Sequence, residues 1–150
     1  MTDIATFTTG RLFGLLGSGT LSTCVAIMTY DSPDLDWMSE LGEKAKTHFQ
    51  SVYILQLGNG SMKSFSGDSS ALLLIYGLEH CDPQSPETHS VRSSLDVQRD
   101  KGIASVICLD EAAYKKHFCD KASPLYKFCC MVEQDSLCDL TNTATRNGKA

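Results

Sequence analysis

Residues 24–57 read CVAIMTYDSPDLDWMSELGEKAKTHFQSVYILQL, and this stretch decides the fold. Residues 24–30 form a continuous, partly β-branched apolar run, which predicts a buried strand, although a run this short also fits a turn of buried helix. Residues 52–57 are predicted to be a second strand. Asp31 or Ser32 can cap a helix between them, and Pro33 suits the first helical position because its missing N–H costs nothing there. The apolar face of that helix recurs at near-helical spacing: Leu35, Met38, Leu41, Ala45 and Phe49. The stretch therefore predicts a strand–helix–strand unit, whose crossover should be right-handed if the strands are parallel in one sheet.

Further strands are predicted on the carboxyl-terminal side. Residues 58–60 read Gly-Asn-Gly, which indicates a turn, so a short strand at 62–65 would complete a hairpin. The later strand predictions are a central strand at 71–78, an edge strand at 91–98 and a buried strand at 103–109.

Two more helices complete the prediction. Asp110 can cap a helix over 111–121, and Ser123-Pro124 can open another. The second would carry Leu125, Phe128, Cys129 and Val132 on one face. Residues 1–19 are poorly patterned and form a loop or a short helix around 12–16, whereas 142–150 is a polar, frayed tail. The sequence predicts one domain over 1–150, α/β to α+β, with a mixed five- or six-stranded sheet and about three helices.

Composition restricts the partners and the location. The formal net charge of -5 does not suit a nucleic-acid binder. The longest apolar runs, 71–78 and 24–28, are far shorter than the roughly 20 residues that span a bilayer. Asp3 sits where a signal peptide carries positive charge. We therefore expect a cytoplasmic protein, with specialised secretion into a host cell left open, and a protein as its partner or substrate.

The seven cysteines do not resemble a disulfide framework. Their number is odd, and several lie within apolar stretches such as 106–109 and 128–131, where free cysteine behaves as a small buried hydrophobe. The sequence therefore predicts that all seven remain reduced thiols, as in cytosolic proteins.

Motifs for a metal or a cofactor are weak. Gly17-Ser18-Gly19 precedes a strand, whereas a phosphate-binding loop follows one and opens a helix. The pairs His80-Cys81 and His117…Cys119 lack the spacing of zinc ligands, and an exposed position on a helix explains His117. We expect no cofactor and no metal site.

Cys24 is the candidate catalytic residue. A small, polar, glycine-containing loop over 17–23 delivers this cysteine to the edge of an apolar run. A thiol nucleophile needs a base, for which His89 is the first choice and His80 the alternative, and Asp110 would orient the imidazole. Beside the cysteine, hydroxyl side chains and backbone N–H groups would form an oxyanion site; those residues are Thr20, Ser22 and Thr23.

The segment 20–26, TLSTCVA, resembles the nucleophile segment of the chemoreceptor glutamine deamidases. Its LSTC portion is also similar to that of the cytotoxic necrotizing factor type of glutamine deamidase toxins. Thr23 replaces the small residue before the cysteine, and no histidine occurs at 37–44, where those families lead one to expect it. The order cysteine, histidine, aspartate also resembles papain-like Rho-inactivating deamidase effectors. These resemblances imply a cysteine-dependent amidohydrolase that deamidates a protein side chain.

The alternative is a non-catalytic interaction protein of the immunity, adaptor or accessory type. Small size, an acidic balance and the weakness of every motif fit this alternative equally well. The two hypotheses predict different surroundings for the sulfur atom of Cys24. A catalytic Cys24 should lie in a cleft with its sulfur near a histidine, whereas a Cys24 sealed among apolar side chains favours the interaction protein.

Overall fold

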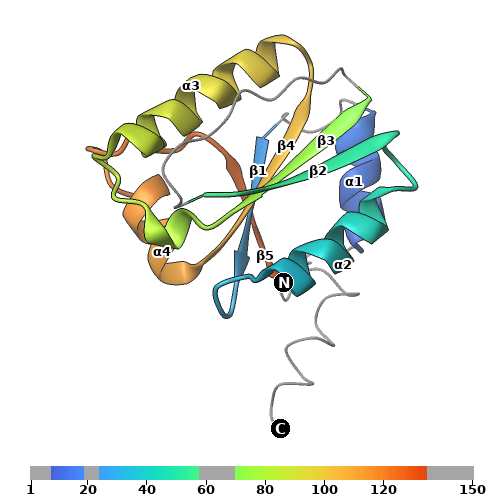
Figure 1. The fold of residues 1–150 in the computed structure, drawn as a ribbon, viewed down its shortest axis with the longest axis horizontal. Coiled ribbons are helices and arrows are strands. Elements are labelled where there is room, and N and C mark those ends of the chain that lie inside the picture. The colour runs from blue at the N-terminus through green and yellow to red at the C-terminus, as the bar shows by residue number, and fades with distance from the viewer. Residues whose placement is uncertain (1–7, 19–23, 58–69, 135–150) are drawn as a thin grey trace, which may run out of the picture.

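Five parallel strands form the sheet at the centre of the molecule (Figure 1). They are β1 (Cys24–Thr29), β2 (Ser51–Gln56), β3 (Ala71–Tyr76), β4 (Ala104–Asp110) and β5 (Cys130–Glu133), in the spatial order β2-β3-β4-β1-β5. The chain was analysed as a computed structural model, which describes residues 8–18, 24–57 and 70–134. Every β3 residue is buried, as expected of a strand covered on both faces.

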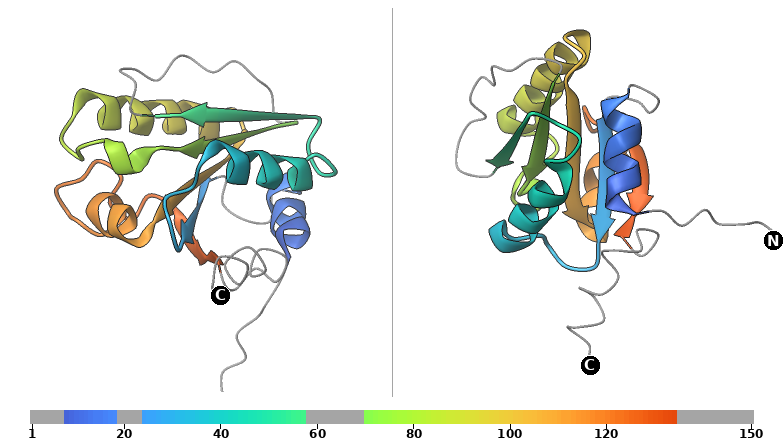
Figure 2. Two further views of the ribbon diagram at one scale, coloured as in Figure 1. Left: turned by 60° about the horizontal axis from the view of Figure 1, so that its bottom comes forward. Right: turned by 90° about the vertical axis from the view of Figure 1, so that its right-hand side faces the viewer.

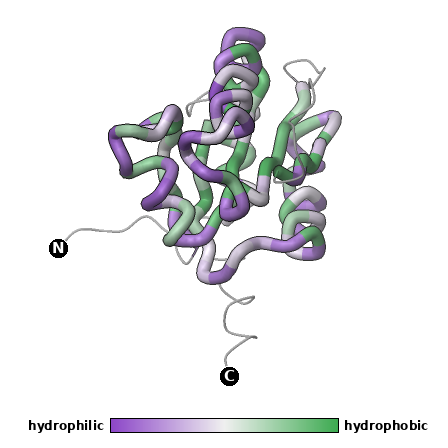
Figure 3. The backbone as a smooth tube through the Cα atoms, turned by 60° about the vertical axis from the view of Figure 1, so that its left-hand side comes forward, coloured by the Kyte–Doolittle hydropathy of each residue, from purple (hydrophilic) through white to green (hydrophobic). Residues whose placement is uncertain are grey.

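Four helices cover the two faces of the sheet, as the views of Figure 2 show. On one face, α1 (Thr9–Gly17) and α2 (Leu35–Ala45) pack against β1, β3 and β4. On the other face lie α3 (Pro86–Asp100) and α4 (Glu111–Phe118), together with the short 3-10 helix η1 (Leu78–His80). Figure 3 shows the strands as apolar tubes beneath helices that alternate between polar and apolar segments. Two apolar layers therefore hold the sheet between the helices.

The chain crosses the sheet in two directions. From β1 it passes through α2 to β2 on one face, and from β4 it passes through α4 to β5 on the opposite face. Because both the direction and the face are reversed, the two crossovers have the same hand, as parallel sheets require. The connections after the neighbouring strands β1 and β4 consequently diverge at their carboxyl ends, where ligands commonly bind in open α/β sheets.

The predicted α/β domain and the strand–helix–strand unit over 24–57 are confirmed. The sheet is parallel throughout the described residues rather than mixed, and four α-helices occur there instead of about three. The predicted cap of α2 is off by two or three residues, since Asp34 accepts the N–H of Trp37 at 2.9 Å. Residues 12–16 take the helical alternative, inside α1. The hairpin at 58–65 and the tail at 142–150 lie outside the described residues.

The edge strand predicted at 91–98 is wrong, because these residues lie in α3. The hydroxyl of Ser85 accepts the N–H of Thr88, and Pro86 occupies the first turn. Val91 and Leu95 are buried at a spacing of four residues, which is the helical period. The capping signal at Ser85-Pro86 was present in the sequence, and the apparent alternation that followed it was misleading.

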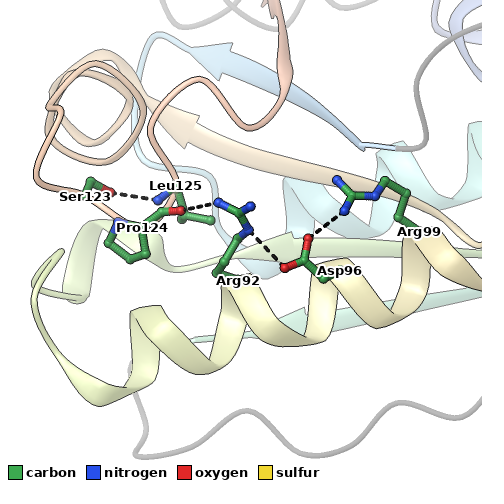
Figure 4. A network of polar contacts seen from close by, with 6 residues as sticks. All are labelled: Arg92, Asp96, Arg99, Ser123, Pro124 and Leu125. Atoms are coloured by element: carbon green, nitrogen blue, oxygen red, sulfur yellow. Dashed lines mark hydrogen bonds and ion pairs between the residues drawn. The ribbon is translucent and has the colours of Figure 1, made fainter.

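The helix predicted from Ser123 is also wrong, because turns occupy 121–127 and β5 follows. Ser123 accepts the N–H of Leu125 at 3.1 Å, which closes a turn instead of a helix cap. Figure 4 shows that the Arg92 guanidinium reaches from α3 to the carbonyl of Pro124 at 2.7 Å. The same guanidinium lies 4.4 Å from the ring centre of Phe128. Contacts with α3 therefore hold these turns in place and keep the segment out of a helix.

Candidate functional site

Cys24, the predicted nucleophile, lies at the amino end of β1 and is 6% exposed. Its sulfur forms a disulfide with Cys129, the residue before β5, and the two Cα atoms are 5.2 Å apart. The surrounding side chains are apolar and belong to the α3 and α4 face of the sheet. The prediction of seven free thiols is therefore wrong. Thr20, Ser22 and Thr23, the predicted oxyanion residues, lie outside the described residues.

The other predicted catalytic residues lie toward the opposite end of the strands. Cys24 pairs with Ser105 in register, whereas Asp110 pairs with Thr29, five residues further along β1. Five residues of strand span roughly 16 Å. His80 is exposed at the end of η1, and His89 is exposed in the first turns of α3, both after the carboxyl end of β3. The structure therefore does not bring Cys24 together with His80, His89 or Asp110.

Polar groups at the carboxyl ends of β1 and β4 bind one another. Asp110 caps α4 by accepting the N–H of Ala113, and its second oxygen accepts the Ser32 hydroxyl, both at 2.9 Å. The Glu79 carboxylate accepts the N–H of Asp110 at 2.9 Å. Nearby, the buried Gln134 side chain accepts the N–H of Tyr30 at 3.2 Å. These side chains join the loops after β1, β3, β4 and β5, which is a structural role.

His117 is buried in α4, so the prediction of an exposed helix histidine is wrong. Its Nε2 lies 3.0 Å from the carbonyls of both Leu78 and Cys81, so this nitrogen carries the proton and donates it. Within the described part of the chain, Nδ1 has no hydrogen-bond partner. Burial lowers the pKa of His117, which favours the neutral imidazole. His117 therefore fastens α4 to the η1 turn as an uncharged side chain.

A cavity of about 290 Å³ opens beside the disulfide. It is lined by Tyr114, Phe118, Cys119, Tyr126, Lys127 and Cys129. Cys119 is an exposed free thiol that ends α4, whereas the free thiols Cys81 and Cys108 are buried. This site was not predicted, because Cys119 and Cys129 were expected on two successive helices. The available signal was the three cysteines within residues 119–130.

Strand β2 has an unusual exposure for a parallel strand. Tyr53 is 43% exposed and Ile54 is 36% exposed, and no charged residue occurs between Ser51 and Gln56. Val52 and Ile54 point toward α2, since a Cβ atom placed on Gly42 would lie 3.5 and 3.6 Å from them. Tyr53 and Leu55 point to the other face, where Leu55 packs against the α3 and α4 layer. Both faces of this edge strand are thus only partly covered.

The chain matches no protein-family model, no curated protein and no solved structure. In the described ranges, no helix is long and apolar enough to cross a membrane. The same ranges contain no group of three His, Cys, Asp or Glu side chains placed to hold a metal ion. The function of this chain therefore has to be inferred from its own geometry.

Proposed function

We propose that this chain is a non-catalytic protein-interaction domain, and that it binds a second copy of itself by strand addition along β2. The carrying observation is the uncharged edge strand with Tyr53 and Ile54 exposed on opposite faces. Strand addition supplies affinity through main-chain hydrogen bonds and specificity through alternate side chains. The state of Cys24 supports this class of function, because its sulfur is sealed among apolar groups and bonded to Cys129.

The side chains of β2 are self-complementary in one antiparallel register. A two-fold axis perpendicular to the sheet, placed between the two copies of Tyr53, sets the two tyrosines opposite each other. Val52 then faces Ile54 of the second copy on the α2 side, and each such cross-strand pair contributes roughly 0.2–1 kcal/mol. Because β2 carries no charge, the chain's net charge of -5 is not concentrated at this contact. A second copy therefore fits better than a strongly charged partner.

Natural edge strands usually carry charges or prolines that prevent such pairing. Strand β2 has neither over its six residues, Ser51–Gln56. Large exposed apolar side chains on an edge strand favour pairing with another chain. In the proposed dimer the two sheets become continuous, and the half-covered faces of both β2 strands gain apolar neighbours.

Sedimentation velocity at increasing protein concentration tests this proposal. The wild-type chain should shift from monomer to dimer, and Ile54→Lys should remain monomeric because two lysines would approach each other near the dimer axis. Val97→Lys is the matched control, since Val97 is a 48% exposed apolar residue that belongs to α3 instead of β2. If wild type stays monomeric, or if Val97→Lys disrupts the dimer as strongly as Ile54→Lys, the proposal is wrong.

A cytoplasmic location remains part of this proposal and meets one opposing observation. The Cys24–Cys129 disulfide is unusual for the cytosol, where thiols are kept reduced. Alkylation of intact cells followed by mass spectrometry measures how much of this pair is oxidised. A wholly reduced pair supports the cytoplasmic location, and a wholly oxidised pair contradicts it.

A further inference from the structure

The two sulfurs of the disulfide differ in access. Cys24 is 6% exposed and packs in the apolar layer, whereas Cys129 is half-buried and lines the cavity beside α4. Thiol–disulfide exchange begins when a thiolate attacks one sulfur and displaces the other. Access through the cavity leads to Cys129, so Cys24 is the sulfur that would leave.

Cys119 is the thiol placed to make that attack. It lines the same cavity as Cys129, and it is exposed. The N–H of Lys127 donates to the carbonyl of Phe118 at 3.0 Å, which ties the chain before Cys129 to the end of α4. The Lys127 side chain also lines the cavity.

The other free thiols of the described residues are poor competitors. Burial, together with the nearby Glu87 carboxylate, raises the pKa of Cys81 to about 11. Burial also raises the pKa of Cys108, which lies inside β4. Both therefore remain protonated near neutral pH, and neither lines the cavity.

We propose that the cavity is a thiol-exchange site in which Cys119 attacks the Sγ atom of Cys129. Cys119 first loses its proton to solvent. A Cys119–Cys129 bond then forms while the Cys24–Cys129 bond breaks, and Cys24 leaves as a thiolate that takes a proton from solvent. The exchange consumes no oxidant or reductant, because one disulfide and one thiol are present before and after it.

The exchange changes which parts of the fold are joined covalently. The Cys24–Cys129 bond links the amino end of β1 to the residue before β5, across a sequence separation of 105. The Cys119–Cys129 bond would lie wholly within the connection between α4 and β5. The exchange would thereby remove the covalent link between β1 and the β5 edge, whereas the two strands stay paired in the sheet. This inference does not depend on pairing through β2.

Disulfide mapping of the full-length chain tests the exchange directly. A Cys130→Ser background is incubated without oxidant at rising pH, quenched with acid, alkylated with N-ethylmaleimide and digested with trypsin and a glutamate-specific protease. The expected product joins residues 117–121, which contain Cys119 alone, to residues 128–133, with an equal amount of alkylated Cys24. The rate at which it forms should increase with pH because the thiolate is the attacking species.

Cys119→Ser in the same background should abolish this product, and Cys81→Ser should leave it unchanged. Complete alkylation of Cys119 with an intact Cys24–Cys129 bond at every pH would overturn the proposal. A second measurement uses Cys24→Ser, Cys130→Ser protein with oxidised glutathione. A Cys119–Cys129 bond should form with release of two reduced glutathiones, and a lasting mixed disulfide on Cys119 or Cys129 would contradict the inference.

Discussion

The two edges of the sheet are built in opposite ways. At one edge, β5 has four residues and is held by the Cys24–Cys129 disulfide at its start and by the Gln134–Tyr30 hydrogen bond after its end. At the other edge, β2 has six residues, no charge and exposed apolar side chains on both faces. Among the described residues, β2 pairs with β3 alone.

This difference shows that specific side-chain contacts are concentrated at the β5 edge of the sheet. The β5 edge is short and is reinforced by side chains from α3, β1 and the turns before it, which leaves little free backbone for pairing. The β2 edge is long enough to accept another strand and lacks the usual features that prevent it. The asymmetry is the basis of the proposed interaction role.

The largest effect should come from opening the disulfide. Cys24→Ser should lower the free energy of unfolding by about 2–5 kcal/mol, since the bond closes a loop across 105 residues of sequence. Urea unfolding followed by circular dichroism measures the loss. Cys119→Ser is the control and should change stability by less than about 0.5 kcal/mol, because its side chain is exposed. Equal losses in the two variants would contradict the account of the β5 edge.

Acid should lower the free energy of unfolding through His117, which lies in α4. Burial lowers its pKa in the folded state below the ordinary histidine value of about 6.5, so the unfolded chain binds the proton more readily. The free energy of unfolding should therefore be constant above about pH 7 and decrease as the pH falls below the unfolded pKa. His117→Gln should lose this decrease, whereas His89→Gln, at an exposed position, should retain it. Parallel pH profiles for wild type and His117→Gln would contradict this assignment.

A smaller effect is expected from Arg92, which joins α3 to the segment before β5. Arg92→Ala removes the bond to the Pro124 carbonyl, the ion pair with Asp96 and the contact with the Phe128 ring. The ion pair is about one-third exposed and solvent screens it, so the loss of stability should be about 1 kcal/mol. Thermal unfolding measures it. Lys115→Ala, which removes an exposed pair with Glu111, should have almost no effect, and equal losses would show that Arg92 does not anchor the segment.

The sequence was sufficient for the α/β class and for the unit over residues 24–57, because long periodic patterns report burial directly. It was not sufficient where the same local motif, Ser-Pro, occurs twice and makes different tertiary contacts. Ser85-Pro86 begins α3, whereas Ser123-Pro124 closes a turn that Arg92 and the Cys129 disulfide hold against other elements. Such tertiary contacts override local propensity and leave no local mark in the sequence.

The candidate site was less predictable than the fold. The small-residue loop before Cys24 suggested a nucleophile, and the distance to His89 and Asp110 depends on strand register that one sequence does not contain. Cys24 can bond to Cys129 because β5 lies beside β1 in the sheet. That strand order is a property of the fold and cannot be seen in the local sequence. Likewise, VYILQL at 52–57 predicts a strand, and its edge position becomes visible only in the strand order.

Amide hydrogen exchange along β2 tests strand addition most directly. Raising the protein concentration should slow exchange at alternate amides of β2, those directed away from β3, while β4 and β5 exchange as before. Ile54→Lys should remove the concentration dependence. Exchange in β2 that is independent of concentration, or slowing confined to another element, would contradict pairing along β2.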